Sequence, residues 1–490
     1  MNGEGIVRLP SDGSMHVLRL ERISRKRDED RPLTDGLLRF EHTLLQRLSY
    51  SLGTIADVIA YQSFTFLVFT FYFSVVGVTI DWMFLGFVLW SIWNAINDPT
   101  FGVISDATET RWGRRYPYIA ATIVPLSLMM YFLWTPPIHA DLASFLYFIL
   151  ALFAFDGIYT LMSLNLTSLF PELFRNPEER ASVNVIRQVF GVVGLVIAFI
   201  LPTIFIEDVT YDLQGYQRAG VVMGFLVFSL LLICLRFGCS EKGLVRPRRS
   251  TSVLVDFTSI GGILRNRSFI TYALANLLNW YVFGILASVV PLYCKFVLGV
   301  PPGETFLTGL VLGCAFIVAA LVIPVWQKVG LRLGSRMAFM ISTASFIVGL
   351  LPFLFATNVT EGFIAAGLTG VGLAGALYFR DIMIAEVIDE DEYATWRRRE
   401  GVYFGTNGFL IRLSAILTYF TIAFVFMGTG WTEYTPRPGV DVVFGIRLLM
   451  SVFPIFALAS ALLVLYAYPL KPDRLMGIRQ KLRERTGERV

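Results

Sequence analysis

The sequence contains few of the residues that build most catalytic and metal sites. Its 490 residues include three histidines and four cysteines. The cysteines lie in or beside apolar segments without the spacing of metal ligands, so we interpret them as small buried hydrophobes. A G-x-x-x-x-G-K-[ST] loop is also lacking, which argues against direct use of ATP. We therefore expect a protein that is not an enzyme and has no resident cofactor or metal.

Charged residues are scarce as well, at 16% of the chain, where a soluble domain carries about 25%. Hydrophobic residues make up 55% of the chain, and the mean hydropathy is +0.63. A helix that spans a bilayer needs about 20 mostly apolar residues. Twelve such stretches are present, over residues 48–76, 83–106, 117–135, 142–170, 182–206, 219–238, 269–297, 304–327, 336–356, 362–388, 401–428 and 442–468. We predict an all-α polytopic membrane protein with 12 transmembrane helices.

Lysine and arginine gather in alternate connections between these stretches. By the positive-inside rule, this pattern places both termini in the cytoplasm. We expect the protein to lie in the plasma membrane. The longest central connection divides the spans six and six, a pattern typical of the major facilitator fold. The predicted parts are a cytoplasmic tail (1–47) with an amphipathic segment at 36–48, a six-helix half (48–239), a cytoplasmic linker (240–267), a second six-helix half (268–470) and a basic cytoplasmic tail (471–490).

Residues 94–118 keep two carboxylates near the end of an apolar segment and follow them with three arginines. Asp98 lies about two turns inside the second span, where an ionised carboxylate costs roughly 2.5–3.5 kcal/mol, so it must face a cavity or a partner. Asp106 lies at the water boundary, within reach of arginines in the following turn. The stretch predicts a conformational motif made of Asp106, Arg111, Gly113, Arg114 and Arg115. A weaker copy of the segment 111-RWGRR-115, 332-RLGSR-336, follows the second span of the other half.

Two signatures carry a family resemblance. The run N-D-P-x-x-G-x-x-x-D-x-x-x-x-R-x-G-R-R-x-P-Y (97–118) and the segment MIAEVIDEDEY (383–393) resemble the hallmarks of the glycoside–pentoside–hexuronide:cation symporter family, which includes melibiose permease. The resemblance covers most of residues 45–470. It implies uptake of a sugar or sugar-like small molecule driven by H+ or Na+. A eukaryotic branch of the family includes a lysophospholipid transporter, so the family does not fix the substrate.

The resemblance also implies a cation site, which this chain alters. The family uses a carboxylate one helical turn before that of Asp98, where this chain has Asn94, and a further acid in the fourth span is replaced by Ser163. Asp156 lies seven residues before Ser163 on the same helix face and supplies an acid there. The candidate coupling residues are Asp98, Asn94, Asp57 and Asp156. A further possibility is that Arg412 pairs directly with Asp98 as a built-in cation, which would make coupling dispensable. We hypothesise that Asp98 is bound either by an ion or by Arg412.

Substrate contacts follow from the same resemblance and from polar groups in apolar spans. Asp57 lies near the position of a sugar-contacting aspartate, and Arg187 and Arg412 match basic residues that line the cavity. The substrate-binding candidates are Asp57, Gln62, Arg187, Asn279, Trp280 and Arg412, with Tyr61, Tyr159, Asn276 and Asn407 as further possibilities. Lys295 and Arg447, near span ends, are expected to be structural and to snorkel.

We therefore predict a secondary transporter, a cation:sugar symporter that works by alternating access. Its expected partners are the small-molecule substrate and membrane lipid, without nucleic acid, and the expected oligomeric state is a monomer. Two alternatives stay open. The chain could carry a non-sugar organic solute or a lysolipid, or it could be a sensor that binds solute on the same fold without moving it.

Overall fold

The computed structural model describes residues 41–108, 110–137, 141–239, 262–396, 399–435 and 440–486. Most of the expected N-terminal tail, most of the expected linker and the last four residues lie outside the described residues. The first long helix begins at Leu44, within the segment expected to lie on the membrane surface.

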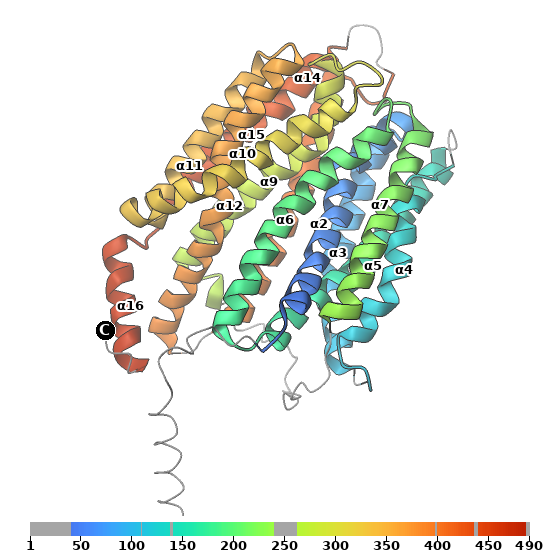
Figure 1. Cartoon of the computed structure of the whole chain (residues 1–490). Helices are drawn as coiled ribbons and strands as arrows, with labels where there is room; N and C mark the ends of the chain where they lie inside the picture. Colours follow the sequence, from blue (N-terminus) through green and yellow to red (C-terminus); the bar gives the residue numbers. More distant parts are fainter. Residues whose placement is uncertain are drawn as a thin grey trace, which may run out of the picture. The chain divides into compact units, whose positions relative to one another are not determined.

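Twelve long helical rods follow one another along the described chain (Figure 1). The first six are α2 (Leu44–Thr70, continued by η1, Phe71–Val76), α3 (Ile80–Ala107), α4 (Tyr116–Phe132), α5 (Asp141–Leu173), α6 (Pro177–Phe205) and α7 (Leu213–Ile233, continued by η2, Cys234–Gly238). The second six are α9 (Arg267–Phe296), α10 (Phe306–Leu333), α11 (Ser335–Leu350, continued by η3, Leu351–Leu354), α12 (Val359–Thr395), α13 (Glu400–Thr429) and the rod formed by α14 (Val442–Arg447), η4 (Leu448–Val452) and α15 (Phe453–Tyr466). A last helix, α16 (Pro472–Thr486), packs against α12.

Ten of these rods are long and apolar enough to cross a membrane. The other two are α4, which is apolar and shorter, and α3, which carries Asp81, Asp98 and Asp106. The described residues contain no strand, so the predicted all-α class is confirmed. Rod ends differ from the predicted spans by a few residues. The largest difference is at α12, which continues through the acidic residues 389–392 to Thr395 because a helix can project beyond the hydrocarbon.

Asparagine side chains begin three of the rods. Asn176, Asn266 and Asn358 precede α6, α9 and α12, and each accepts hydrogen bonds from backbone N–H groups of the first turn. These caps satisfy donors that have no partner within the helix. Two carboxylates in the first turn of α6 add a favourable interaction with the helix dipole.

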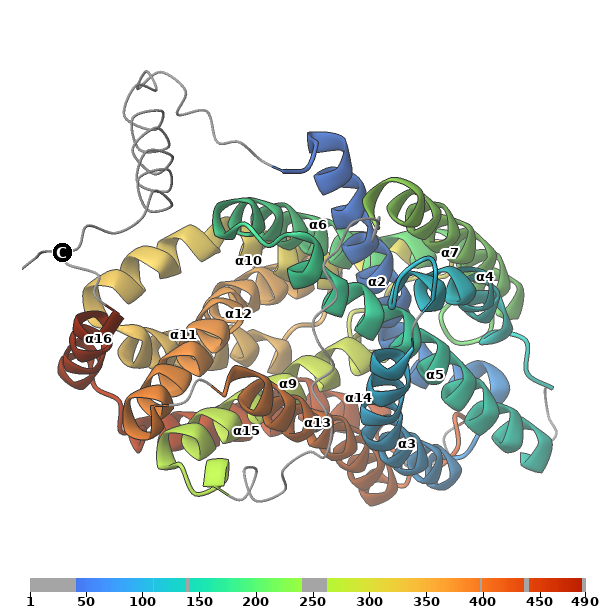
Figure 2. The same cartoon turned by 90° about the horizontal axis from the view of Figure 1, so that it is seen from below.

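The same pairs of helices pack in each half, as expected for a repeat. The first helix contacts the fifth and sixth (α2 with α6 and α7; α9 with α13 and α15), and the fourth contacts the second and third (α5 with α3 and α4; α12 with α10 and α11). Glycines with positive φ also recur before the third helix, Gly113 at +119° and Gly334 at +80°. Figure 2 shows the two groups of helices side by side. The main helix pairs that join the halves are α2 with α9, α3 with α13, and α6 with α10.

The seam between α6 and α10 is packed backbone against backbone. A Cβ atom added to Gly309 would lie 2.3 Å from the main-chain oxygen of Phe199, and one added to Gly313 would lie 3.1 Å from the side chain of Ile200. Small residues at such positions allow two membrane helices to approach closely.

The two ends of the bundle differ. At the end where α2, α6, α9 and α13 finish, which we call the sealed end, contacts cross between the halves. Glu207, after α6, accepts hydrogen bonds from the N–H of Gly303 (2.8 Å) and the hydroxyl of Thr305 (2.7 Å) through its main-chain oxygen. The ring of Phe73 meets that of Trp431 at 5.2 Å. The sealed end is the upper end in Figure 1, beside α14, and we call the other end, beside α16, the open end.

Candidate functional site

A cavity of about 480 Å³ lies between the halves, between α2, α3 and α5 on one side and α9 and α13 on the other. Its aromatic lining residues are Tyr61, Trp90, Tyr159, Trp280, Phe283 and Tyr419. Its hydroxyl-bearing lining residues are Thr65, Ser91, Thr160, Ser163, Thr167, Ser168, Ser288, Ser414 and Thr418, with Tyr61, Tyr159 and Tyr419 again. Aromatic faces and hydroxyl groups therefore dominate the wall. We call this space the central cavity.

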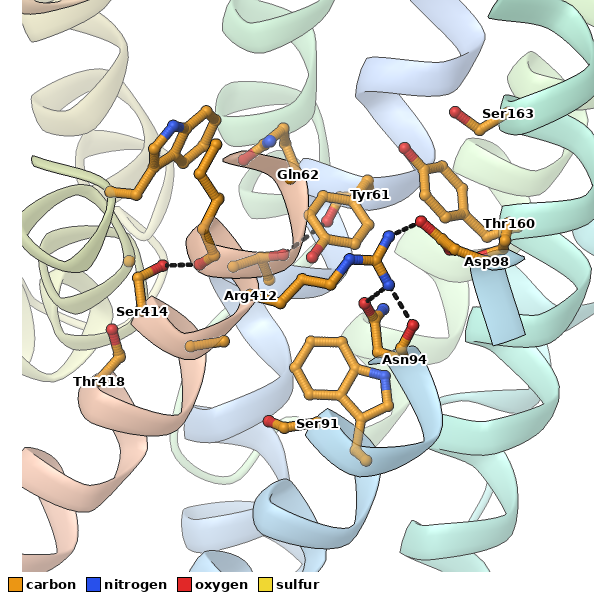
Figure 3. A pocket seen from close by; sticks show the side chains of 18 of the residues that line it. Tyr61, Gln62, Ser91, Asn94, Asp98, Thr160, Ser163, Arg412, Ser414 and Thr418 are labelled. Atoms are coloured by element: carbon orange, nitrogen blue, oxygen red, sulfur yellow. Dashed lines mark hydrogen bonds and ion pairs between the residues drawn. The ribbon is translucent and has the colours of Figure 1, made fainter. Parts of the chain in front are cut away.

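One arginine crosses the central cavity from half to half. Arg412 on α13 forms an ion pair with the carboxylate of Asp98 on α3, and it donates hydrogen bonds to both the side-chain and the main-chain oxygen of Asn94 (Figure 3). Asp98 and Arg412 both line the central cavity, and their side chains are 30% and 26% exposed. The sequence requires a cavity or a partner for Asp98, and the structure provides both.

A second carboxylate lies behind this pair. Asp156 on α5 is fully buried and accepts hydrogen bonds from Asn94 Nδ2 (2.6 Å) and Asn97 Nδ2 (2.5 Å). Asn94 therefore links the two acids, because its nitrogen donates to Asp156 while its oxygen accepts from Arg412. Three of the four candidate coupling residues thus join in one network with Arg412. Sequence reasoning missed Asn97, although it stands within the quoted signature.

The fourth candidate, Asp57 on α2, lies apart from this network. Its carboxyl group faces the hydroxyl groups of Tyr159 and Ser163, which line the central cavity. Its Oδ1 atom is buried and has no hydrogen-bond donor among the described residues. The same holds for Gln62 Oε1 and Asn279 Oδ1. A buried acceptor without a donor is costly, so these three atoms need hydrogen-bond donors from elsewhere.

A larger cavity of about 610 Å³ meets the central cavity at Gln62, Trp280 and Phe283, which line both spaces. We call it the second cavity. It lies between α2 and α6 of one half and α9, α10, α11 and α12 of the other. Arg187 lines it and donates to the hydroxyl of Thr54 (3.2 Å), with its guanidinium 4.4 Å from the ring centre of Phe170. Asn279 and Trp280 line it as well. Of the predicted substrate residues, Asp57 and Asn407 line neither cavity, and Asn407 accepts a hydrogen bond from Asn276 Nδ2 (3.2 Å).

The conformational motif forms a compact ionic cluster at the open end of the first half. Arg115, 6% exposed, pairs with Asp106 (2.5 Å) and donates to the hydroxyl of Ser105 (2.6 Å). Arg114 pairs with Glu172 at the end of α5 (2.5 Å). The sequence predicts the arginine–aspartate pairing but not Glu172, which follows a different span. Arg111 departs from the prediction, because it is exposed and lies over the ring of Trp112 at 4.4 Å.

The second signature forms a matching cluster at the open end of the other half. Asp391 on α12 accepts two hydrogen bonds from Arg399, at 2.9 and 2.5 Å. The hydrogen bond with Asp391 raises the pKa of Arg399 above its usual value. Glu390 pairs with Arg474 of α16 (2.7 Å), and Glu386 accepts from the hydroxyl of Ser335 (2.6 Å). Carboxylates of α12 are thus tied to its neighbours.

An ion pair also crosses the sealed end. Lys295, near the end of α9, pairs with Asp208 in the connection after α6. Asp208 is 2% exposed and also accepts from the N–H (2.8 Å) and the hydroxyl (2.5 Å) of Thr210. Lys295 thus binds a partner from the other half, which the expectation of a structural, snorkelling residue did not include. Arg447, the other residue expected to be structural, donates to the main-chain oxygen of Ala356 (2.9 Å) within its own half.

Comparisons with known proteins agree with this geometry. The family described as MFS/sugar transport protein matches residues 49–472. An uncharacterised symporter of Synechocystis is 23% identical and aligns with 90% of this chain and 96% of its own. The isoprimeverose transporter of Lactiplantibacillus pentosus is 24% identical, over 74% of this chain and 76% of its own. The sodium-dependent lysophosphatidylcholine symporter 1-B of Danio rerio is 23% identical, over 80% of each chain.

Solved structures share the fold. The nucleoside transporter NupG superposes with a TM-score of 0.62 at 13% identity, over 86% of this chain and 99% of its own. A bacterial homologue of the human lysosomal transporter Spinster, in an inward-facing and unoccupied conformation, superposes with a TM-score of 0.59 at 16% identity, over 88% of this chain and 98% of its own. At such identity the likeness concerns the fold alone, which is the predicted fold of two six-helix halves.

Proposed function

Because the chain belongs to the MFS/sugar transport protein family, and is thus a secondary transporter and not an enzyme, we propose that it carries a sugar or sugar-like solute in symport with H+ or Na+. The protein acts as a monomer in the plasma membrane. Both termini lie in the cytoplasm, so the sealed end faces outward and the cavities open inward.

The lining of the central cavity supports a polyhydroxylated substrate. Hydroxyl groups and aromatic faces suit the polar edges and apolar faces of a sugar ring. The buried acceptors Asp57 Oδ1, Gln62 Oε1 and Asn279 Oδ1 gain donors when sugar hydroxyls approach them. The isoprimeverose transporter, a relative over three-quarters of its length, carries a sugar by its name.

The observation that carries the coupling proposal is the position of Arg412. Its guanidinium group occupies the oxygens of Asp98 and Asn94, which are the ligands that a sodium ion prefers. A cation and the guanidinium group therefore compete for one set of oxygens. Since Arg412 comes from the other half, each change of occupant alters the contact between α3 and α13. A cation held by Asp98 and Asn94 in one state is displaced when Arg412 returns.

Transport by purified protein in proteoliposomes tests this proposal. A panel of labelled sugars is offered with an imposed sodium gradient, an imposed proton gradient, or neither. We expect gradient-driven accumulation for the wild type. Asp98→Asn removes the charge for which cation and arginine compete, so it should abolish accumulation and leave downhill uptake. Asp81→Asn, an exposed acid at the start of the same helix, is the control and should accumulate like the wild type.

Unchanged accumulation by Asp98→Asn under both gradients would refute a coupling role. Adding labelled lysophosphatidylcholine to the panel tests a lysolipid substrate. The apolar wall of the second cavity, formed by Leu195, Phe316, Ile323 and Leu373 among others, favours this candidate. Uptake of lysophosphatidylcholine without uptake of any sugar would favour that second candidate.

A further inference from the structure

The second copy of the arginine motif, 332-RLGSR-336, lacks the ion pairs of the first. In the first half, arginines of the motif pair with Asp106 and Glu172. Gln327 stands five residues before the second copy, at the place that Asp106 has before the first. Glu386 accepts a hydrogen bond from the serine hydroxyl of the second copy (2.6 Å). The arginines of the second copy form no ion pair with a carboxylate among the described residues.

The second copy lies beside the start of α16. A Cβ atom added to Gly334 would lie 2.8 Å from Cγ of Pro472, so the two segments touch (Figure 1). Arg332 and Lys471 flank this contact in the sequence and are exposed, and their side chains form no ion pair or hydrogen bond within the part of the chain that the structure describes. Arg336 donates to two main-chain oxygens at the end of α15 (3.2 and 2.5 Å). Three cations therefore gather at one place at the open end, which we call the basic corner.

Exposed apolar side chains lead to the basic corner along two neighbouring helices. Met337 and Ile341 are one turn apart on α11, and Leu463 and Tyr466 are one turn apart at the end of α15. The two helices pack against each other, and the guanidinium group of Arg336 lies 5.9 Å from the ring centre of Tyr466. This surface is thus apolar within the membrane and basic where the membrane ends, with a tyrosine at the boundary. A phospholipid has the same order of groups, an acyl chain followed by a phosphate.

We infer that the basic corner binds an anionic phospholipid, whose phosphate is held by Arg332, Arg336 and Lys471 while an acyl chain lies along α11 and α15. Anionic lipids attract basic residues that follow a membrane span, and a guanidinium fork can bind a phosphate with two hydrogen bonds. The lipid supplies the negative charge that Asp106 and Glu172 supply to the first copy of the motif. The inference does not depend on the substrate or on coupling. The leaflet alone follows from the proposed topology, in which the open end faces the cytoplasm.

Lipid binding to the purified full-length protein tests the inference. Native mass spectrometry measures the apparent affinity for dioleoyl phosphatidylglycerol and for dioleoyl phosphatidylcholine, which has the same chains and no net charge. We expect phosphatidylglycerol to bind at least about tenfold more tightly and to raise the unfolding temperature further. The double variant Arg332→Gln, Lys471→Gln should bind phosphatidylglycerol about 30-fold more weakly, and Lys471→Gln alone about fivefold. Arg332→Lys keeps the charge and should retain most of the affinity.

The matched control is the double variant Arg265→Gln, Arg267→Gln, which removes two charges from exposed residues at the start of α9 and should bind phosphatidylglycerol like the wild type. An equal loss of affinity in this control overturns the inference, because the attraction would then follow total charge. Equal affinity of the wild type for the two lipids overturns it as well, and so does undiminished binding by the Arg332 and Lys471 double variant. Inorganic phosphate tests a free anion as the source of the charge. If it stabilises the wild type as much as phosphatidylglycerol does, the basic corner is a site for soluble anions and the lipid inference is wrong.

Discussion

The ion pair between Lys295 and Asp208 should hold the sealed end closed, and Lys295→Met tests this. The pair joins the end of α9 in one half to the connection after α6 in the other. Alternating access requires the halves to part at this end, where both groups would become hydrated. Removing the lysine leaves a carboxylate buried without its cation only while the end is sealed. The substitution should therefore favour the state in which this end is open.

The magnitude follows from burial. Breaking a buried ion pair by removing one partner costs about 3–5 kcal/mol. Lys295 keeps 23% of its side chain exposed, and Asp208 retains two hydrogen bonds from Thr210, so we take a cost below this range, about 2 kcal/mol. At 1.4 kcal/mol for each factor of ten, the ratio of sealed to opened molecules should fall about 30-fold.

Electron spin resonance distance measurements report this ratio. Spin labels at positions 218 and 304, both exposed and in different halves, span the sealed end. Cys314 is replaced by serine to prevent labelling there, since the other three cysteines are buried. Lys295→Met should shift the distances to longer values. Adding Asp208→Asn removes the unpaired charge and should recover part of the shift.

Lys328→Met is the matched control, because Lys328 is exposed on α10 near the opposite end. It should leave the distances unchanged. Identical distance distributions for Lys295→Met and the wild type, in protein of normal thermal stability, would refute the role of the pair in sealing this end.

Two further substitutions test packing and the open-end cluster by thermal unfolding in detergent. A Cβ atom at Gly372 would lie 2.2 Å from the Cα atom of Phe346, so Gly372→Ala should lower the free energy of unfolding by about 1–3 kcal/mol. A Cβ atom at Gly405 would meet nothing within 4 Å, so the control Gly405→Ala should be neutral or stabilising. Equal effects would contradict this packing. In Arg115→Lys the two guanidinium nitrogens that contact Ser105 and Asp106 are lost, so the free energy of unfolding should fall by about 1–3 kcal/mol. Arg111→Lys, at an exposed position, should change it little. A stable Arg115→Lys variant would show that the cluster needs charge but not geometry.

Hydropathy is sufficient to predict the helices of this fold. Each predicted span overlaps one rod, because apolar length is set directly by the bilayer. The ends are less predictable, since a helix such as α12 continues past the hydrocarbon when charged residues find partners in its neighbours. The contacts between halves are not local in sequence. Nothing near Lys295 indicates that Asp208 will meet it.

The candidate site was predictable where a charge in an apolar span had no local explanation. A carboxylate within the second span, such as Asp98, needs a cavity or a partner, and the family resemblance indicated Arg412 as a residue that lines the cavity. Asn97 and the hydroxyl residues of the central cavity gave no such signal, because uncharged polar residues are tolerated on many helix faces. Arg111 shows the opposite error, since a charge within a motif can still point to solvent.

The seams at α3–α13 and α6–α10 occupy equivalent places in the repeat yet differ in chemistry. The first is joined by a guanidinium group and two polar partners, whereas the second is a close fit of Gly309 against the backbone at Phe199. Dissolved ions act on a charged contact and leave a steric one unaffected. The strength of the α3–α13 contact should thus depend on the ionic strength of the solution, whereas that of the pseudo-symmetric α6–α10 contact should not.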